Sequence, residues 1–153
     1  MHVTIPALGV SADVVPVRVV KDELFPPADP RLLGWWSQGA VPGAGTGTAI
    51  LTGHTVSTGG GVLDNLKKLE VGDRVTVRTE KGVIRYRVVE VTYYSKAELA
   101  RLSGKLFSQS TTGRLVLSTC SNFDGKKYRG NTLAFADPAA DPAAVATEPG
   151  SAE

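Results

Sequence analysis

The stretch LVLSTCSNFDGKKYRGNTLAF, residues 115–135, decides how the fold of this chain is interpreted. Two apolar runs, at 114–120 and 131–136, flank a polar loop, and this pattern is typical of two neighbouring antiparallel strands. Cys120, the only cysteine of the chain, ends the first run, and Arg129 follows the loop. If the two runs pair directly, Arg129 lies within a few ångströms of Cys120, because paired Cα atoms are about 4.5–5.5 Å apart. A guanidinium at that distance favours a thiolate and can donate to a developing oxyanion.

The rest of the chain is rich in Gly, Pro, Thr and Val, and it is predicted to form short strands separated by turns. That pattern is typical of an all-β barrel or sandwich. The clearest hairpin spans 73–90, where apolar residues alternate with polar ones on both sides of a turn at 80–82. Ser95 and Glu98 fit a helix-capping box. The other expected elements are strands at 3–8, 14–20 and 47–53, and short helices at 62–69 and 95–102.

The length of 153 residues suits a single domain. We expect a β-barrel domain at 1–136, followed by a Pro/Ala-rich tail at 137–153 that is disordered or linker-like. The formal net charge of +2 argues against a dedicated nucleic-acid binder, and the basic cluster around Lys126 is too small for a base-stacking platform. The sequence contains no run of about 18 apolar residues that would predict a membrane span.

The Cys120 thiol becomes a nucleophile if a proton acceptor lies beside it. His54 is the better of the two histidines, because it follows a strand of small residues, whereas His2 is the second residue of the chain. Imidazole titrates near neutral pH and serves as acid or base. Cys120, His54 and Arg129 therefore form a candidate constellation for covalent acyl transfer. The alternative is that Cys120 is a small buried apolar residue. One Cys and one His do not establish a metal site.

The same three residues carry a resemblance to the sortase family. The run VLSTC at Val116–Cys120 resembles the sortase TLxTC motif, with Val in place of the first Thr. Arg129 matches the sortase arginine that begins the strand after the active-site loop. His54, in the context LTGHT, matches the sortase histidine that follows its own strand.

Other stretches extend this resemblance over about residues 3–136. The segments IPALGVSADVVPV, at 5–17, and VLDNLKKLEVGDRVTV, at 62–77, also look like sortases. The GWW run at 34–36 and the TCSNFD run at 119–124 are most similar to the actinobacterial class F type.

The resemblance implies a closed eight-stranded sortase-type β-barrel with one or two short helices, in which 1–136 is the catalytic domain. It also implies a cysteine transpeptidase that cleaves an LPxTG-like sorting signal between Thr and Gly and transfers the acyl group to an amine. Cys120 would be the nucleophile, and His54 the general acid and later the base. Arg129 would hold the substrate and stabilise the oxyanion. Thr119 and Ser121 are expected to line the peptide groove.

The implied partners are a surface-protein sorting signal and an amine acceptor, such as a peptidoglycan precursor or a pilin lysine, with no nucleic acid. No cofactor or metal is expected, and calcium activation stays open. The implied location is the extracellular face of the cell membrane, with an N-terminal transmembrane anchor outside these 153 residues. Two alternatives stay open: a hydrolytic cysteine peptidase that uses the same site, and a non-catalytic peptide-binding barrel in which Cys120 is packed in the core.

Overall fold

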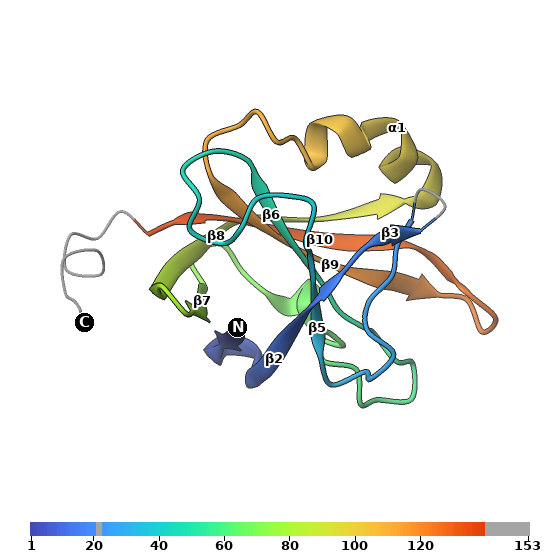
Figure 1. The fold of residues 1–153 in the computed structure, drawn as a ribbon. Helices are drawn as coiled ribbons and strands as arrows, with labels where there is room; N and C mark the ends of the chain where they lie inside the picture. The colour runs from blue at the N-terminus through green and yellow to red at the C-terminus, as the bar shows by residue number, and fades with distance from the viewer. Residues whose placement is uncertain (21–22, 140–153) are drawn as a thin grey trace.

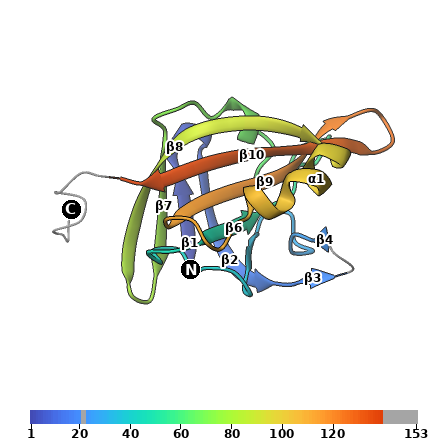
Figure 2. The same cartoon turned by 90° about the horizontal axis from the view of Figure 1, so that it is seen from above.

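The structure, a computed structural model, describes residues 1–20 and 23–139, and these form a closed β-barrel with a helix on its outside (Figures 1 and 2). The order of the eight barrel strands is β1-β2-β5-β6-β9-β10-β8-β7. The pairs β2–β5 and β6–β9 are parallel, and the other pairs are antiparallel. The predicted eight-stranded closed barrel is confirmed. The strand bounds are β1 His2–Ile5, β2 Val10–Val17, β5 Leu33–Trp36, β6 Thr48–Thr52, β7 Arg74–Thr79, β8 Gly82–Ser95, β9 Arg114–Phe123 and β10 Tyr128–Pro138.

Two short strands, one α-helix and two 3-10 turns complete the described part of the chain. The strands β3 (Val19–Val20) and β4 (Glu23–Leu24) pair as a small separate hairpin. The α-helix α1 spans Lys96–Leu106, and 3-10 turns lie at Pro6–Leu8 and Leu66–Lys68. No helix within residues 1–20 and 23–139 is both long and apolar enough to cross a membrane.

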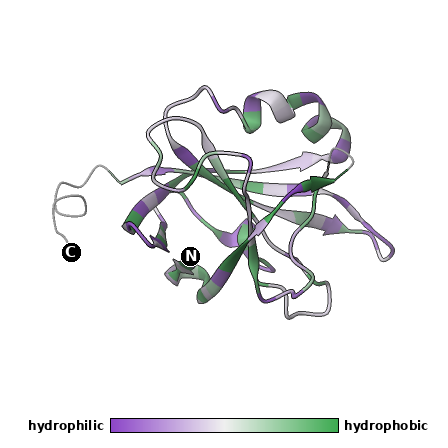
Figure 3. Ribbon diagram, viewed as in Figure 1, coloured by the Kyte–Doolittle hydropathy of each residue, from purple (hydrophilic) through white to green (hydrophobic). Residues whose placement is uncertain are grey.

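The barrel interior is filled by every second residue of its strands. On β9, Leu115 and Leu117 are fully buried in the main core, whereas Val116 belongs to a separate cluster outside the barrel. Val75 and Val77 of β7 join the main core, as their alternation with polar residues predicted. Figure 3 shows the same alternation as changes of colour along the strands. Each strand therefore has a fixed inner and outer face, and this decides which side chains reach the surface.

Helix α1 covers the outer face of β9 and β10 (Figure 2). The predicted capping box is confirmed at its start, where the Ser95 hydroxyl accepts from the Glu98 N–H and the Glu98 carboxylate accepts from the Ser95 N–H. At its end, Arg114 donates to two carbonyls of the last turn. The helix begins beside the start of β10, where Lys96 Nζ lies 3.1 Å from Asn131 Oδ1. The residues that bury its apolar side are Leu106, Val116, Leu133 and Phe135.

The element boundaries differ from the expected ones where proline or polar sequence intervenes. The strand expected at 3–8 ends at Ile5, because Pro6 begins a 3-10 turn that Gly9 closes with a φ of 66°. The helix expected at 62–69 is reduced to the 3-10 turn at Leu66–Lys68. Helix α1, expected to end at 102, continues to Leu106.

The end of the barrel lies two residues beyond the expected boundary at 136. Strand β10 continues to Pro138, which is paired with Tyr86 of β8, and the Ala139 N–H donates to the Arg85 carbonyl. Most of the predicted tail, residues 140–153, lies outside the described residues.

Candidate active site

Four strands bring the candidate site together as a row of side chains on the outer face of the barrel. Asn131 of β10 is the paired residue of both Tyr94 on β8 and Cys120 on β9. On the other side of β9, Thr52 of β6 is paired in parallel with Ser118. Beyond the end of β6, the Gly53 N–H donates to the Ser118 carbonyl, and the Gly53 carbonyl accepts from the Thr119 hydroxyl. The paired order across the strands is therefore Tyr94, Asn131 and Cys120, and the segment that carries His54 continues on the other side of β9.

Cys120 is a free, half-buried thiol. It shares the outer face of β9 with Val116 and Ser118, so its side chain points away from the main core. The fully buried residues Leu115 and Leu117 fix the strand beneath it. This position argues against the alternative in which Cys120 is packed in the core, and it leaves the sulfur accessible from the surface.

His54 follows β6 directly and is held by the connection that precedes β5. Its Nε2–H donates to the Pro27 carbonyl over 2.6 Å, because a carbonyl oxygen only accepts. The backbone of His54 is fixed too, since its carbonyl accepts from the Leu63 N–H over 3.0 Å. With Nε2 carrying the proton, Nδ1 is the ring nitrogen that exchanges a proton with other groups.

Thr119 joins the end of β9 to the loop that carries His54. Its hydroxyl donates to the Gly53 carbonyl over 2.8 Å and lies 2.6 Å from the hydroxyl of Thr55. The side chain is only 3% exposed and faces the barrel interior. This burial argues against the expected direct contact between Thr119 and a bound peptide. The residue instead fixes His54 relative to Cys120.

The expected antiparallel pairing of the run that ends at Cys120 with the run 131–136 is confirmed. Asn131 occupies the paired position, because β9 continues to Phe123 and β10 begins at Tyr128. Arg129 lies on the same face as Cys120 but diagonally, at a Cβ separation of about 7–8 Å for such pairs. It is therefore near the thiol but does not lie opposite it.

The Arg129 guanidinium pairs with Asp124 over 3.2 Å from Nε to Oδ2. Asp124 also accepts from the N–H groups of Lys126 and Lys127 in the turn of the β9–β10 hairpin. These backbone hydrogen bonds hold the pKa of Asp124 below its ordinary value of 3.8, with smaller help from the Arg129 charge. In this structure the arginine is thus held at an exposed, hydrophilic hairpin tip (Figure 3).

The hairpin tip also touches the His54 loop, through a residue that sequence reasoning missed. The Tyr128 hydroxyl donates to the Thr55 carbonyl over 2.8 Å, and its ring packs on Phe123 with centroids 4.9 Å apart. Ser121, the second expected groove residue, is half-buried and accepts a hydrogen bond from Thr132 over 2.9 Å. Its predicted contact with peptide stays a prediction.

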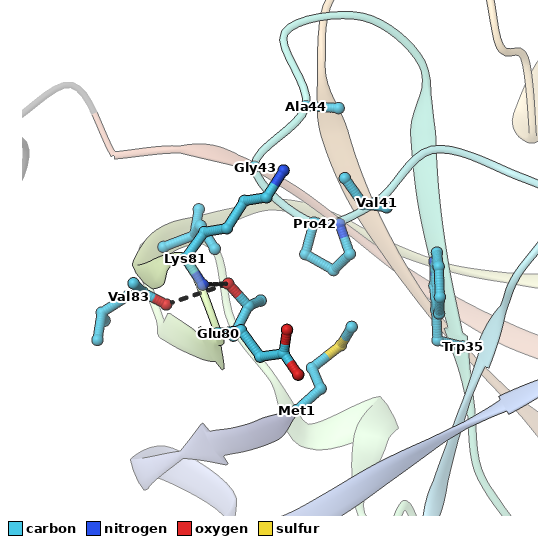
Figure 4. A pocket seen from close by; sticks show the side chains of 12 residues that line it. Met1, Trp35, Val41, Pro42, Gly43, Ala44, Glu80, Lys81 and Val83 are labelled. Carbon is cyan, nitrogen blue, oxygen red and sulfur yellow. Dashed lines mark hydrogen bonds between the residues drawn. The ribbon is translucent and has the colours of Figure 1, made fainter.

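Residues 1–20 and 23–139 contain no group of three or more His, Cys, Asp or Glu side chains that could hold a metal ion. A cavity of about 650 Å³ lies at the opposite end of the barrel (Figure 4). Trp35, Val41, Pro42 and the tip of the β7–β8 hairpin line it, and none of the candidate site residues does.

The comparisons with known proteins agree with the fold described above. Residues 3–139 match the sortase domain family. A search of curated proteins finds no match.

Among solved structures, sortase A from Corynebacterium diphtheriae (a lid mutant) is similar with a TM-score of 0.70 and 19% identity, over 92% of this chain and 70% of that one. Streptococcus agalactiae sortase C1, in its complex with MTSET, has a TM-score of 0.71 and 21% identity, and the match covers 90% of this chain and 66% of that one. Sortase C-1 from Actinomyces oris has a TM-score of 0.66 and 22% identity, and the match covers 90% of this chain and 72% of that one. At these identities the structures show the shared fold.

The family match covers most of the chain, and the chain therefore belongs to the sortase family. Sortases are cysteine transpeptidases that act on sorting signals at the surface of the cell envelope. This family assignment makes the enzyme a cysteine transpeptidase, in agreement with the expectation from the VLSTC run and His54.

Proposed function

We propose that this transpeptidase cleaves an LPxTG-like sorting signal between Thr and Gly and transfers the acyl group to an amine. The observation that carries the proposal is the half-buried Cys120 on the outer face of β9, with His54 directly after Gly53, which hydrogen-bonds to Ser118 and Thr119 of β9. A peptide that crosses the outer face in an extended conformation passes both side chains. Helix α1 flanks that path.

The proposed reaction begins when Nδ1 of His54 takes the proton of the Cys120 thiol and the sulfur attacks the threonine carbonyl carbon. The carbonyl oxygen becomes an oxyanion, and a cation such as Arg129 stabilises it. His54 gives a proton to the glycine nitrogen as the C–N bond breaks, which leaves a thioester on Cys120. An amine then attacks the thioester, His54 takes the proton from it, and the thiol leaves. The donation of Nε2–H to Pro27 supports Nδ1 as the atom that carries these proton transfers.

Arg129 must leave or share its partner Asp124 to reach the substrate. Arg129 lies two positions before Asn131, the residue paired with Cys120, and an arginine side chain can span that separation. The ion pair of Arg129 with Asp124 is on the surface, where such pairs contribute little to stability. We propose that substrate binding redirects the guanidinium from the Asp124 carboxylate to the peptide. The diagonal position of Arg129 is compatible with that movement.

The finer assignments follow from the sequence resemblance. We propose a class F enzyme, on the GWW run at 34–36 and the TCSNFD run at 119–124. Its acceptor is an envelope amine such as a peptidoglycan precursor or a pilin lysine, and no cofactor takes part. The enzyme is proposed to work at the extracellular face of the membrane, held by an N-terminal anchor.

The test is incubation with an LPxTG peptide and an excess of triglycine, with products identified by mass spectrometry. The proposal predicts a product cut after Thr and joined to triglycine, and no product with Cys120→Ala. Cleavage without joining would replace the transpeptidase with the hydrolytic alternative. Retained activity of Cys120→Ala would contradict the assignment of the nucleophile.

A further inference from the structure

The side chain nearest to Cys120 by strand register is Asn131, and neither the sequence motifs nor the proposed mechanism gives it a role. Asn131 and Cys120 are paired across β10 and β9 and face the same side. The Cβ atoms of such a pair are about 4.5–5.5 Å apart, closer than those of the diagonal pair that Arg129 makes. Asn131 is therefore better placed than Arg129 to reach a group bound to the sulfur.

The orientation of the Asn131 amide is fixed by Lys96, the first residue of α1. Lys96 Nζ lies 3.1 Å from Asn131 Oδ1. An ammonium has only donors, so the amide oxygen must face it and the amide NH₂ must face away. Nδ2 has no hydrogen-bond partner among the described residues, and it is free to donate to a ligand. The capping box at Ser95 holds the start of α1, and with it the position of Lys96.

The charges near the thiol favour this role as well. Arg129 is paired with Asp124, whereas no carboxylate among the described residues forms an ion pair with Lys96. The ammonium therefore polarises the amide that it contacts and makes Nδ2–H a better donor. Asparagine amides are among the groups that stabilise oxyanions in acyl-transfer enzymes.

We propose that Asn131 is an oxyanion donor for acyl transfer at Cys120, and that Lys96 is the positioning residue that orients its amide. This inference rests on the proposed function to the extent that it requires acyl transfer to Cys120. When the sulfur bonds to a carbonyl carbon, the C=O pair moves onto oxygen, and Nδ2–H hydrogen-bonds that oxygen until the leaving group departs. No proton is transferred from the amide.

Two reagents separate this role from a general effect on the thiol. An ester such as p-nitrophenyl acetate acylates Cys120 through a tetrahedral oxyanion, whereas iodoacetamide alkylates the same sulfur by direct displacement and forms none. The measured quantity is the ratio of the two rates, each followed by intact-protein mass spectrometry. Neither reagent requires a sorting peptide, so failure of peptide transfer would overturn the proposed substrate without affecting this test.

Asn131→Asp is the sharpest variant, because a carboxylate keeps the contact with Lys96 but has no hydrogen to donate. We expect Asn131→Asp and Asn131→Ala each to lower the ratio of acylation to alkylation by about 10- to 100-fold, at or below the range for loss of one oxyanion donor. Lys96→Met should lower this ratio less, and Lys96→Arg should keep it close to that of the unmodified protein. Lys105→Met, an exposed lysine at the other end of α1, is the matched control and should leave it unchanged.

The proposal is overturned if both Asn131 variants keep the ratio within twofold of the unmodified protein. It is also overturned if acylation and alkylation fall together, since a structural role for the Lys96–Asn131 contact would slow both reactions.

Discussion

Two regions of the candidate site hold their functional residues in different ways. One is the floor, formed by Cys120, His54 and Thr119, and the other is the tip of the β9–β10 hairpin, residues 124–129. At the floor, Cys120 lies on β9 and His54 follows β6, and the buried Thr119 hydroxyl joins the two segments by donating to the Gly53 carbonyl. At the tip, Arg129 is exposed and is held by one ion pair to Asp124 in a turn that contacts solvent. The floor is fixed by core packing and buried hydrogen bonds, whereas the tip is fixed by surface contacts.

This difference separates the two parts of the chemistry. In the proposed reaction the sulfur and the imidazole exchange a proton, and their relative position must be preset. The arginine is proposed to act on charge that appears only when a substrate is present, so a weak surface ion pair that can exchange is adequate. Substitutions in the two regions should therefore differ in their effects on activity and on stability.

The largest effect is expected at the floor. His54→Ala removes the group that moves protons in both half-reactions, and kcat/KM should fall by about 10²- to 10⁴-fold, the usual contribution of general acid–base catalysis. Peptide transfer measured by chromatography provides the readout. His2→Ala is the matched control, because His2 contacts Asp13 and Ser11 on β2 and should not affect the rate. An equal loss in the two variants would contradict the role of His54.

A smaller loss is expected at the tip. Arg129→Gln should lower kcat by about 10²-fold, the lower end of the range for one oxyanion-stabilising group, because Gln keeps much of the length but not the charge. Thermal unfolding should be almost unchanged, since the arginine is exposed. Lys126→Gln, on the same turn, serves as the control. A large drop in stability for Arg129→Gln would mean that the tip is as structurally constrained as the floor.

Thr119→Val tests the bracing of the floor directly. Valine has nearly the same shape, but it leaves the Gly53 carbonyl without its donor, so the free energy of unfolding should fall by about 1–3 kcal/mol. Urea denaturation measures this change. Thr92→Val removes an exposed hydrogen bond to Glu90, and we expect a smaller change. If the two variants lose the same stability, the contrast between buried and exposed bracing is wrong.

The smallest effect concerns acid. The pKa of Asp124 is lower in the folded protein than its ordinary value of 3.8, because backbone N–H groups stabilise the carboxylate. Its contribution to stability is therefore present above 3.8 and is lost as the pH falls through the lowered folded value. Asp124→Asn should weaken the dependence of stability on pH below about pH 4. The pH dependence near neutral should be the same in the variant and the unmodified protein. Urea denaturation at several pH values checks this. An unchanged acid dependence would show that the hydrogen bonds to Asp124 do not stabilise the fold.

The sequence predicted the parts of this molecule that depend on local patterns. Alternation in β7 and β8 gave the hairpin, and the Ser95–Glu98 spacing gave the start of α1. It also singled out Cys120 and His54, since each ends an apolar strand. These features depend on residues that are close along the chain.

The features that were missed depend on register and on distant segments. Polar residues such as Asn122 carry no strand pattern, and yet backbone pairing extends the hairpin past Cys120 into the segment expected to be a loop. The contact of Pro27 with His54 joins residues far apart in the chain, and no local signal indicates it. The same holds for Lys96 and Asn131, which are 35 positions apart.

The most direct test of the account is whether a peptide acyl group becomes attached to Cys120. The measurement is the intact mass of the enzyme after brief mixing with an LPxTG peptide in the absence of amine, followed by fragment mapping. The account predicts an added mass equal to the peptide up to its threonine, located on Cys120 and removed by triglycine. An adduct on another residue, or turnover of the peptide by Cys120→Ala, would contradict it.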